Sequence, residues 1–508
     1  MAYIKSFKDQ NWLLPPSLSD LIPKDHVCLL IESFIDEQDF SSFDLKYSGA
    51  GHPAYHPRLL LKLLVMGVLD KVRSSRRLAR NARENVVYMY LSEKLCPDFR
   101  TISDFRKNNP TIVKKAFQHT VTLAKNEGLL DLSNLATDGT KIKSNAANRN
   151  VLTKEELSFL KNFVDAELEE WSKQDSLEDD FFKDLRGSDQ LPNSSKKKMQ
   201  KAVKHYMNQV KEKGNLFKLG LQNKLKKAEK ELADNNLGKV NITDPESRFM
   251  LSKKGKIEFS YNPQITTERN GFIIANNVCN ESNDTNQLKP QVSQTKENLK
   301  EIPKNVKWFF DNNYLEGSNL NFLNENKIDA YISCKKQISD KPYDKANFVY
   351  NKDNDEYLCP NGKRLVFQNQ SFDKTKNRKI RFYKGKSCKM CGDKKACTNR
   401  KGGCRVIKKY PAEEEMEHMK KKMQTNEAKK IYHLRKHIVE FVFGDLKENK
   451  ALNTFLTKSL ETVRTEFNLI SLASNIYKIW RKKQEKGNKI ITKNGFNIKE
   501  GFKNYVFA

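Results

Sequence analysis

The sequence contains no apolar stretch as long as the roughly 20 residues that a membrane-spanning helix needs. The longest candidate, Leu59–Leu69, is too short and includes Lys62. The first residues also lack the basic segment followed by an apolar segment that marks an export signal, so we expect no secretion. No unit of roughly 20–50 residues repeats, which disfavours a solenoid. These absences predict a soluble, cytoplasmic protein that makes no contact with a membrane.

Acidic residues are scarce relative to basic ones. The 508 residues include 93 Lys and Arg but only 63 Asp and Glu, which gives a formal net charge of +30. Such an excess points to a polyanionic partner, with nucleic acid as the first candidate and an anionic membrane surface as the second. Because no amphipathic anchor with aromatic residues stands out, nucleic acid is favoured.

The nine cysteines are an odd count that does not suit a disulfide framework. Five of them fall in one window, where Cys388 and Cys391 have the C-x2-C spacing with which two thiolates bind one tetrahedral zinc ion. Cys359 and Cys397 can complete a four-sulfur site, with Cys404 as a competing fourth ligand. We therefore expect a structural Zn²⁺, because four thiolates leave no coordination position open. A set of free thiols on a loop is the alternative.

Residues 1–130 are predicted to form a helical, DNA-binding domain. Pro57 opens the apolar stretch, as proline does in the first turn of a helix. Five arginines then recur at helical spacing, which predicts that they share one face: Arg73, Arg76, Arg77, Arg80 and Arg83. With a second short helix at Thr101–Lys107, this pattern suggests a helix-turn-helix-like module that lays basic side chains on phosphates. A solvated charged face is the alternative.

From residue 131 the pattern changes to strands with two long interruptions. Residues 132–143 alternate like a strand around Asp138, and further strands are predicted at Lys256–Thr267, Gly271–Cys279, Asn305–Phe310 and Ile328–Ser333. The first interruption, 151–240, is charge-rich and helical, and we interpret it as an antiparallel helical hairpin. It begins with a capping box of Thr153 and Glu156.

The second interruption, 335–410, contains the clustered cysteines and is predicted to be a β-rich insertion. The chain then becomes helical again, and Thr457–Lys486 has the apolar spacing of one packed helix face. Residues 481–508 are predicted to be a basic C-terminal tail.

Three acidic residues stand among apolar neighbours: Asp138, Asp311 and Glu440. An acid in such surroundings is costly to bury unless a cation compensates its charge. Two divalent metal ions about 3.5–4 Å apart would provide that compensation, and Mg²⁺ prefers oxygen ligands. A chain with 63 acids offers many such triples, so the residue types alone allow the site without selecting it.

Four blocks of the sequence resemble, in order, the DDE transposases of bacterial insertion sequences, in the branch with an all-helical N-terminal domain. They are the segment Gly51–Lys62, the strand motif Thr137–Lys141, the pair Asp311 and Tyr314, and the signature Tyr432, Arg435, Glu440 and Lys447. The segment Tyr261–Gln264 also resembles the strand that follows the helical insertion in this family.

Two features depart from the family pattern. Asn312 and Asn313 stand where alanine and glycine are usual. The interval from Arg435 to Glu440 is one residue longer than the commonest spacing, and Lys436 could fill the basic position instead.

The resemblance implies an α/β fold similar to ribonuclease H, with a mixed sheet in one catalytic domain, 131–480, that contains both insertions. Asp138 would bridge two Mg²⁺ ions, while Asp311 and Glu440 would each hold one. These metals, rather than protein cations, would neutralise the acids. Tyr432 and Arg435 would position the transposon end. Lys447 would contact a DNA phosphate.

The implied activity is Mg²⁺-dependent cleavage and strand transfer at the terminal inverted repeats of the protein's own element. The partners would be double-stranded DNA, as transposon end and target, and a second copy of the chain in the DNA complex, at the bacterial nucleoid. The alternative is a catalytically inactive or repurposed DNA-binding descendant. A general Mg²⁺ nuclease would not explain the N-terminal helices. Three other acids rank below the triad as ligands and are either unrelated to the site or support its ligands: Asp244, Asp284 and Asp329.

Overall fold

The computed structural model describes residues 17–46, 53–166, 191–213, 215–252, 255–334, 341–373, 378–388, 390–399 and 403–485. The start of the Gly51 block, part of each predicted insertion and most of the predicted basic tail lie outside these residues. Within them, no helix is long and apolar enough to cross a membrane.

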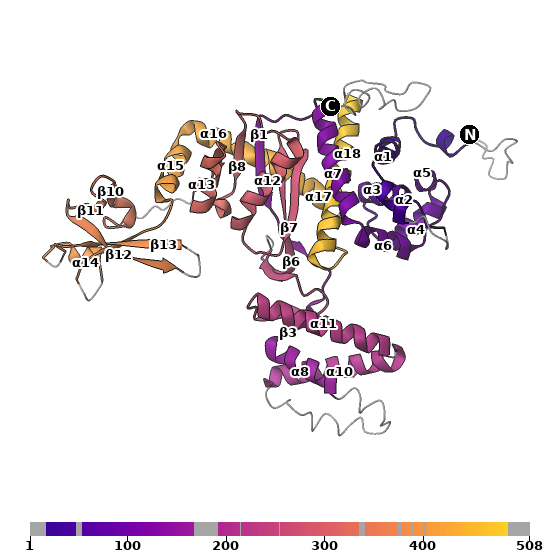
Figure 1. Ribbon diagram of the computed structural model, residues 1–508, viewed down its shortest axis with the longest axis horizontal. Coiled ribbons are helices and arrows are strands. Elements are labelled where there is room, and N and C mark those ends of the chain that lie inside the picture. Colours follow the sequence, from indigo (N-terminus) through magenta and orange to yellow (C-terminus); the bar gives the residue numbers. More distant parts are fainter. Residues whose placement is uncertain are drawn as a thin grey trace, which may run out of the picture.

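A mixed sheet stands at the centre of the molecule (Figure 1). Its five main strands follow the order β7-β6-β1-β8-β9. Strand β6 is antiparallel to both of its neighbours, whereas β1, β8 and β9 are parallel. Their bounds are β1 Asn134–Gly139, β6 Ile257–Glu268, β7 Ile273–Cys279, β8 Lys307–Phe310 and β9 Asp329–Ile332. This mixed sheet confirms the predicted ribonuclease H-like α/β fold. Strands β6, β7, β8 and β9 lie within two residues of the predicted ranges, whereas β1 ends four residues before the predicted end of its range.

Two short strands, β2 (Ile142–Lys143) and β5 (Arg248–Leu251), extend the sheet by pairing with the first half of β6. Helix α12 (Leu288–Leu299) packs against β7, and helix α13 (Gly317–Glu325) lies between β8 and β9 in the chain.

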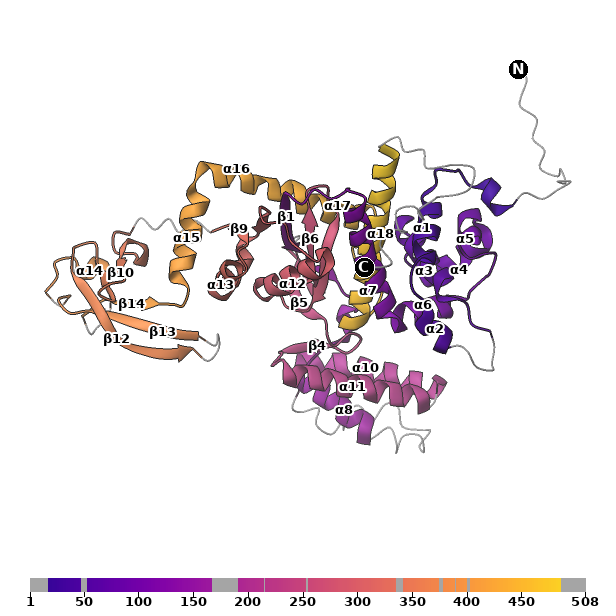
Figure 2. The same ribbon diagram turned by 45° about the horizontal axis from the view of Figure 1, so that its top comes forward.

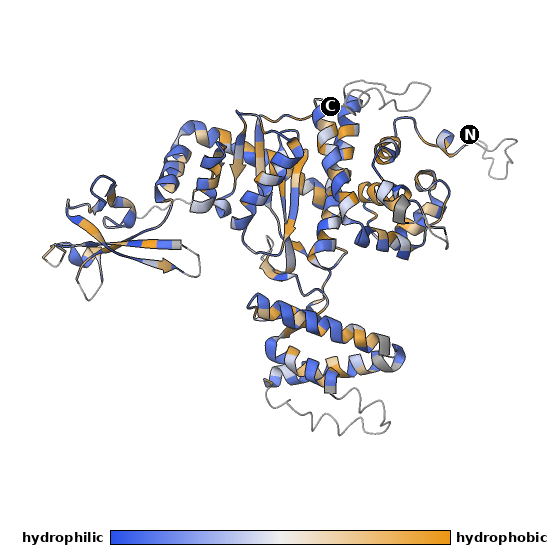
Figure 3. Cartoon of the chain, in the orientation of Figure 1, coloured by the Kyte–Doolittle hydropathy of each residue, from blue (hydrophilic) through white to orange (hydrophobic). Residues whose placement is uncertain are grey.

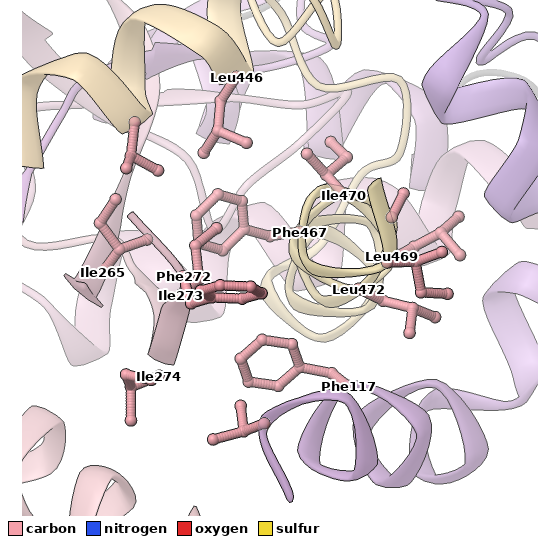
Figure 4. Close-up of a cluster of buried hydrophobic side chains, with 14 of the residues drawn as sticks. Phe117, Ile265, Phe272, Ile273, Ile274, Leu446, Phe467, Leu469, Ile470 and Leu472 are labelled. Carbon is pink, nitrogen blue, oxygen red and sulfur yellow. The ribbon is translucent and has the colours of Figure 1, made fainter. Parts of the chain in front are cut away.

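The long C-terminal helix α18 (Leu460–Glu485) lies between the sheet and the N-terminal helices. Its residues 469–476 are all buried, because the helix has apolar neighbours all around rather than on one face. Figure 4 shows Phe467 and Leu472 of α18 beside Phe117 of α7 (Pro110–Asn126) and Ile273 of β7. One hydrophobic core therefore runs from the N-terminal helices through α18 to the sheet.

The N-terminal helices are η1 Leu18–Leu21, α1 Val27–Asp36, α2 Ser41–Lys46, α3 Pro57–Leu69, α4 Ser75–Glu84, α5 Val86–Leu91 and α6 Phe99–Asn108. The apolar colours in Figure 3 extend from the central sheet into α1 and α3. Lys62 is buried in α3, where its ammonium pairs with Asp36 at 2.8 Å. Helix α6 begins two residues before the predicted Thr101, because Asp98 caps it by accepting from the backbone N–H of Thr101 at 3.0 Å.

The helical insertion leaves the sheet after β2 and has its own apolar core. Thr153 and Glu156 form the predicted capping box, with N–H to side-chain distances of 3.0 and 3.3 Å. The described residues contain three packed helices, so the predicted two-helix hairpin was too simple. Its elements are β3 Val151–Thr153, α8 Lys154–Ala166, α10 Asn193–Lys213, α11 Asn215–Asp234 and β4 Lys239–Asn241.

The second insertion is an antiparallel five-stranded sheet that stands away from the central sheet in Figure 1 and Figure 2. Its small core is largely aromatic and includes Phe348, Tyr357 and Tyr383. Helix α15 (Glu413–Gln424) leads from it back to the central sheet. Its strands are β10 Val349–Asn351, β11 Glu356–Leu358, β12 Arg364–Asp373, β13 Arg378–Gly385 and β14 Val406–Lys409, with the short helix α14 Lys394–Cys397.

Candidate active site

Asp138 lies near the C-terminal end of β1, in the middle of the central sheet, and its side chain is buried. The following residue, Gly139, must be small because side chains of β6 approach it closely. A Cβ atom there would lie 2.0 Å from Nε2 of Gln264 and 2.9 Å from Oδ1 of Asn262. The first acid of the predicted triad is therefore fixed by a rigid strand rather than by a loop.

Asp311 follows β8 directly. Strand β8 is parallel to β1, and Thr137 faces Phe310 across the pair, so the next residues, Asp138 and Asp311, emerge at the same edge of the sheet. The hydroxyl of Tyr432 donates to the carbonyl oxygen of Phe310 at 3.0 Å, which ties this edge to the helix that carries the third acid. Burial raises the pKa of Tyr432 to about 12, and the carboxylates of Asp311 and Asp138 add to this rise.

Glu440 comes from a helical segment made of α16 (Asn426–Arg435), the π turn η7 (Lys436–Glu440) and α17 (Phe441–Glu448). Arg435, at the end of α16, joins the acids. Its Nη2 lies 3.0 Å from Oδ2 of Asp138, and its Nη1 lies 3.9 Å from Oε1 of Glu440. Two of the predicted acids therefore contact one guanidinium, and the charge of Asp311 also raises the pKa of Arg435.

The π turn accounts for the unusual spacing of the third motif. In a regular α-helix two positions five residues apart point about 140° away from each other. A π turn takes up one additional residue, and such turns occur mostly as single insertions at functional sites. Arg435 and Glu440 therefore keep a common face despite the longer interval. Lys436 is exposed, so Arg435, rather than Lys436, is the basic residue that contacts the acids.

A protein cation, Arg435, also lies at the acids in this structure, and their neutralisation by metals stays a prediction. Arg435 is buried between them, and its side chain is only 8% exposed. Burial opposes its charge, but Asp138, Asp311 and Glu440 more than offset this and raise its pKa. Among the described residues, no group of three or more His, Cys, Asp or Glu side chains is close enough to hold a metal ion.

Lys447 lies at the same edge of the sheet. Its Nζ donates to Oγ1 of Thr140 at 2.8 Å, two residues after Asp138. Tyr432, Arg435, Glu440 and Lys447 therefore all reach the C-terminal ends of β1 and β8, as the family signature predicts.

The prediction that five arginines share one DNA-binding helix face is wrong for Arg73. Arg73 precedes α4 and is buried, where its guanidinium pairs with Glu466 of α18 and donates to the carbonyl oxygen of Thr454 at 2.9 Å. It is therefore an internal structural cation and cannot contact DNA from this position. The other four arginines are exposed on α4: Arg76, Arg77, Arg80 and Arg83.

Asp284, which the sequence ranked below the triad as a metal ligand, is a buried acid that accepts from several side chains. Its Oδ1 accepts from Nδ2 of Asn262 at 2.6 Å, from Nε2 of Gln264 at 2.7 Å and from Nζ of Lys141 at 3.4 Å. Its Oδ2 accepts from Nδ2 of Asn313 at 3.3 Å. Asn313 stands where the family pattern usually has glycine. Its hydrogen bond to Asp284 holds the turn that follows Asp311.

The same network explains the Tyr261–Gln264 motif. Oε1 of Gln264 accepts from the hydroxyl of Tyr314, and this tyrosine is fully buried three residues after Asp311. The amides of β6 therefore position the second acid through Asp284 and Tyr314. Asn262 and Gln264 could have indicated this network from the sequence, because alternate residues of a strand point to the same face.

Four cysteines of the second insertion line one cavity: Cys359, Cys388, Cys391 and Cys397. The backbone N–H of Lys363 donates to Sγ of Cys359 at 3.3 Å. Burial raises the pKa of Cys397, and the three other thiols raise it further. Cys404 is buried, and the residues that line this cavity do not include it. The predicted set of four therefore lines one cavity, but among the described residues these thiols do not form a group that could hold a metal ion.

Two comparisons with known families match opposite ends of the chain. Residues 16–108 match the family described as Transposase domain (DUF772), and residues 358–480 match the family described as Transposase DDE domain. The second match includes Glu440 and the cysteines but neither Asp138 nor Asp311. No curated protein matches the chain. Together with the ribonuclease H-like sheet, the two matches indicate a DDE transposase of the insertion-sequence type, with the DUF772 domain near the N-terminus and the DDE domain toward the C-terminus.

Proposed function

We propose that this transposase catalyses Mg²⁺-dependent cleavage and strand transfer of DNA at the terminal inverted repeats of its own insertion sequence. One observation carries the proposal: Asp138 and Glu440 contact Arg435, and Asp311 follows the parallel strand beside Asp138 at the same edge of the sheet. The matching families imply a divalent metal and a DNA substrate, and this edge is where the chain offers carboxylates for the metal.

The acids suit Mg²⁺ because they offer hard oxygen ligands and no sulfur or imidazole. When bound, the metal supplies activation of the attacking oxygen and stabilisation of the leaving oxygen in phosphoryl transfer. Asp138 and Asp311 provide fixed ligands from adjacent parallel strands, while the Glu440 side chain is 48% exposed and keeps the site open to solvent. The edge is therefore accessible to a DNA strand.

The DNA contacts follow from the positions of the basic side chains. Lys447 lies beside Thr140 and can hold a phosphate next to Asp138. Tyr432 and Arg435 would position the transposon end, which for the buried Arg435 requires that its side chain leave the acids. The four exposed arginines of α4 bind phosphates farther from the site, within the helices before residue 130. Two copies of the chain would hold the two ends of the element.

The test uses the full-length protein and a linear DNA that carries one transposon end with its flank. Asp138→Asn, Asp311→Asn and Glu440→Gln should each reduce Mg²⁺-dependent cleavage by at least about a hundredfold and leave binding of the end intact. Asp329→Asn is the matched control, because Asp329 starts β9 at the opposite edge of the same sheet and pairs with Lys422. Cleavage that survives Asp138→Asn would contradict the proposal. End binding by the wild-type protein without any cleavage would favour an inactive descendant.

We also propose that Cys359, Cys388, Cys391 and Cys397 bind a structural Zn²⁺. Their shared cavity and the N–H···S contact at Cys359 support this assignment. Purified protein should then contain about one equivalent of zinc, and Cys391→Ser should remove it. Cys96→Ser, at an exposed cysteine of the N-terminal region, is the control and should leave the zinc in place. A zinc content unchanged by Cys391→Ser would contradict the assignment.

A further inference from the structure

Arg435 is a buried cation in contact with two of the proposed metal ligands. Its Nη2 and Nη1 lie 3.0 Å from Asp138 and 3.9 Å from Glu440, and its side chain is 8% exposed. Within the described part of the chain, its Nε is buried and makes no hydrogen bond. The side chain is therefore held at this position mainly by the charges of the acids.

A cluster of carboxylates needs a compensating cation, because uncompensated buried charge is strongly destabilising. When no metal is bound, another cation must fill this role. Arg435 supplies this cation in the present structure. A guanidinium cannot leave the cluster by losing its proton, since arginine stays protonated in proteins. It must therefore move when another cation takes the same oxygens.

The π turn makes this arrangement possible. Because η7 (Lys436–Glu440) contains one additional residue, the side chains of Arg435 and Glu440 lie on one helix face, and Arg435 reaches Asp138 of β1. One helical segment therefore places both Glu440 and its counter-cation, Arg435, at the site.

We propose that Arg435 is an internal counter-cation of the metal-free site, that it competes with the divalent metal for Asp138 and Glu440, and that it leaves them when the metal binds. This inference rests on the proposed function, since it assumes that these acids hold the metal. It assigns Arg435 a positioning role in the metal-free protein, distinct from any contact with the transposon end.

The proposal is tested by titrating Mn²⁺ into the DNA-free, full-length protein and following the free ion by electron paramagnetic resonance. Arg435→Gln removes the competing charge and should tighten Mn²⁺ binding by at least about tenfold, as expected for a unit charge about 4 Å away. Lys436→Gln removes the neighbouring, exposed charge and should change the affinity by less than about twofold. Binding by Arg435→Gln that is equal to or weaker than that of the wild type would overturn the proposal.

A double variant separates this inference from the proposed function. Asp138→Asn added to Arg435→Gln should abolish the gain in Mn²⁺ affinity. If the gain persists, the metal binds elsewhere and the proposed function fails at Asp138. If the single variant shows no gain while Asp138→Asn still weakens binding, the proposed site stands and the competition is refuted.

A measurement on the wild-type protein covers the case in which Arg435→Gln does not fold. Phenylglyoxal modifies accessible guanidinium groups, and the modified residue can be located by peptide mass. Arg435 should react faster in Mn²⁺ than in EDTA, because the metal displaces it from the acids. An unchanged or slower reaction in Mn²⁺ would overturn the proposal.

Discussion

Deletion of His437 is expected to leave the acid cluster intact, because the π turn η7 (Lys436–Glu440) contains one residue more than an α-helix needs. His437 is exposed, and its ring contacts only the exposed ring of His433 among the ring contacts of this turn, at 5.7 Å. After the deletion, Arg435 and Glu440 would be four residues apart, which places them about 40° apart on a regular helix. Their common face is therefore retained.

Deletion of the equally exposed Lys430 is the matched control. It turns Tyr432 and Arg435 by about 100° relative to the preceding turn of α16. The buried contact of 3.0 Å between Arg435 and Asp138 would then be lost, and breaking such a pair costs about 3–5 kcal/mol. Deletion of His437 removes no buried contact and should change the free energy of unfolding by no more than about 1 kcal/mol.

Urea unfolding and end-DNA cleavage measure the two deletions together. The variant that lacks His437 should unfold close to the wild-type midpoint and cleave at a comparable rate, whereas the variant that lacks Lys430 should be destabilised and inactive. If both deletions abolish cleavage equally, the additional residue is not absorbed by the turn, and the account of the Arg435–Glu440 spacing is wrong.

Four further outcomes follow from the buried charges and the surface. Glu466→Gln should destabilise the protein by about 3–5 kcal/mol in urea unfolding, because it leaves the buried Arg73 without its carboxylate, while the exposed Glu461→Gln should have little effect. Burial opposes the charge of Glu466, but Arg73 and Arg106 lower its pKa. Its stabilisation should therefore be complete at neutral pH and be lost as pH falls through this lowered pKa, as unfolding at successive pH values would show. Asp284→Asn should slow end cleavage without weakening end binding, because it loosens the turn after the second acid; unchanged cleavage would refute this positioning role. Affinity for DNA should fall steeply with salt, and neutral substitutions of the exposed arginines of α4 should flatten that dependence, in a filter-binding titration.

Local patterns predicted the parts of the fold that local forces decide. The alternation and apolar content of Lys256–Thr267 and Gly271–Cys279 predicted β6 and β7, and Pro57 marked the first residue of α3. The family motifs brought Asp138, Asp311 and Glu440 into one hypothesis that the sheet register supports.

The features that the sequence could not reveal depend on partners far along the chain. Arg73 has the spacing of a surface arginine, but its partner Glu466 is 393 residues away, and only the packing of α18 against the N-terminal helices brings them together. Helical spacing reports which residues share a face and does not report what covers that face. The contact of Arg435 with Asp138 escaped prediction for the same reason.

The amino-acid composition could not single out Asp284 as a buried acid. Many acids occur in the chain, and Asp284 has no apolar flank that marks it as buried. Its burial follows from four donors on three separate segments, namely Lys141, Asn262, Gln264 and Asn313. Such a network becomes visible only when the segments are assembled.

The most direct test of the central claim is Mg²⁺-dependent cleavage of transposon-end DNA by Asp311→Asn, measured beside Asp329→Asn. Asp311 is the acid whose place in the triad follows from strand register, since β8 pairs in parallel with β1. The account predicts that Asp311→Asn loses cleavage by at least about a hundredfold while still binding the end, and that Asp329→Asn cleaves like the wild type. Undiminished cleavage by Asp311→Asn would contradict the assignment of the three acids as the catalytic site.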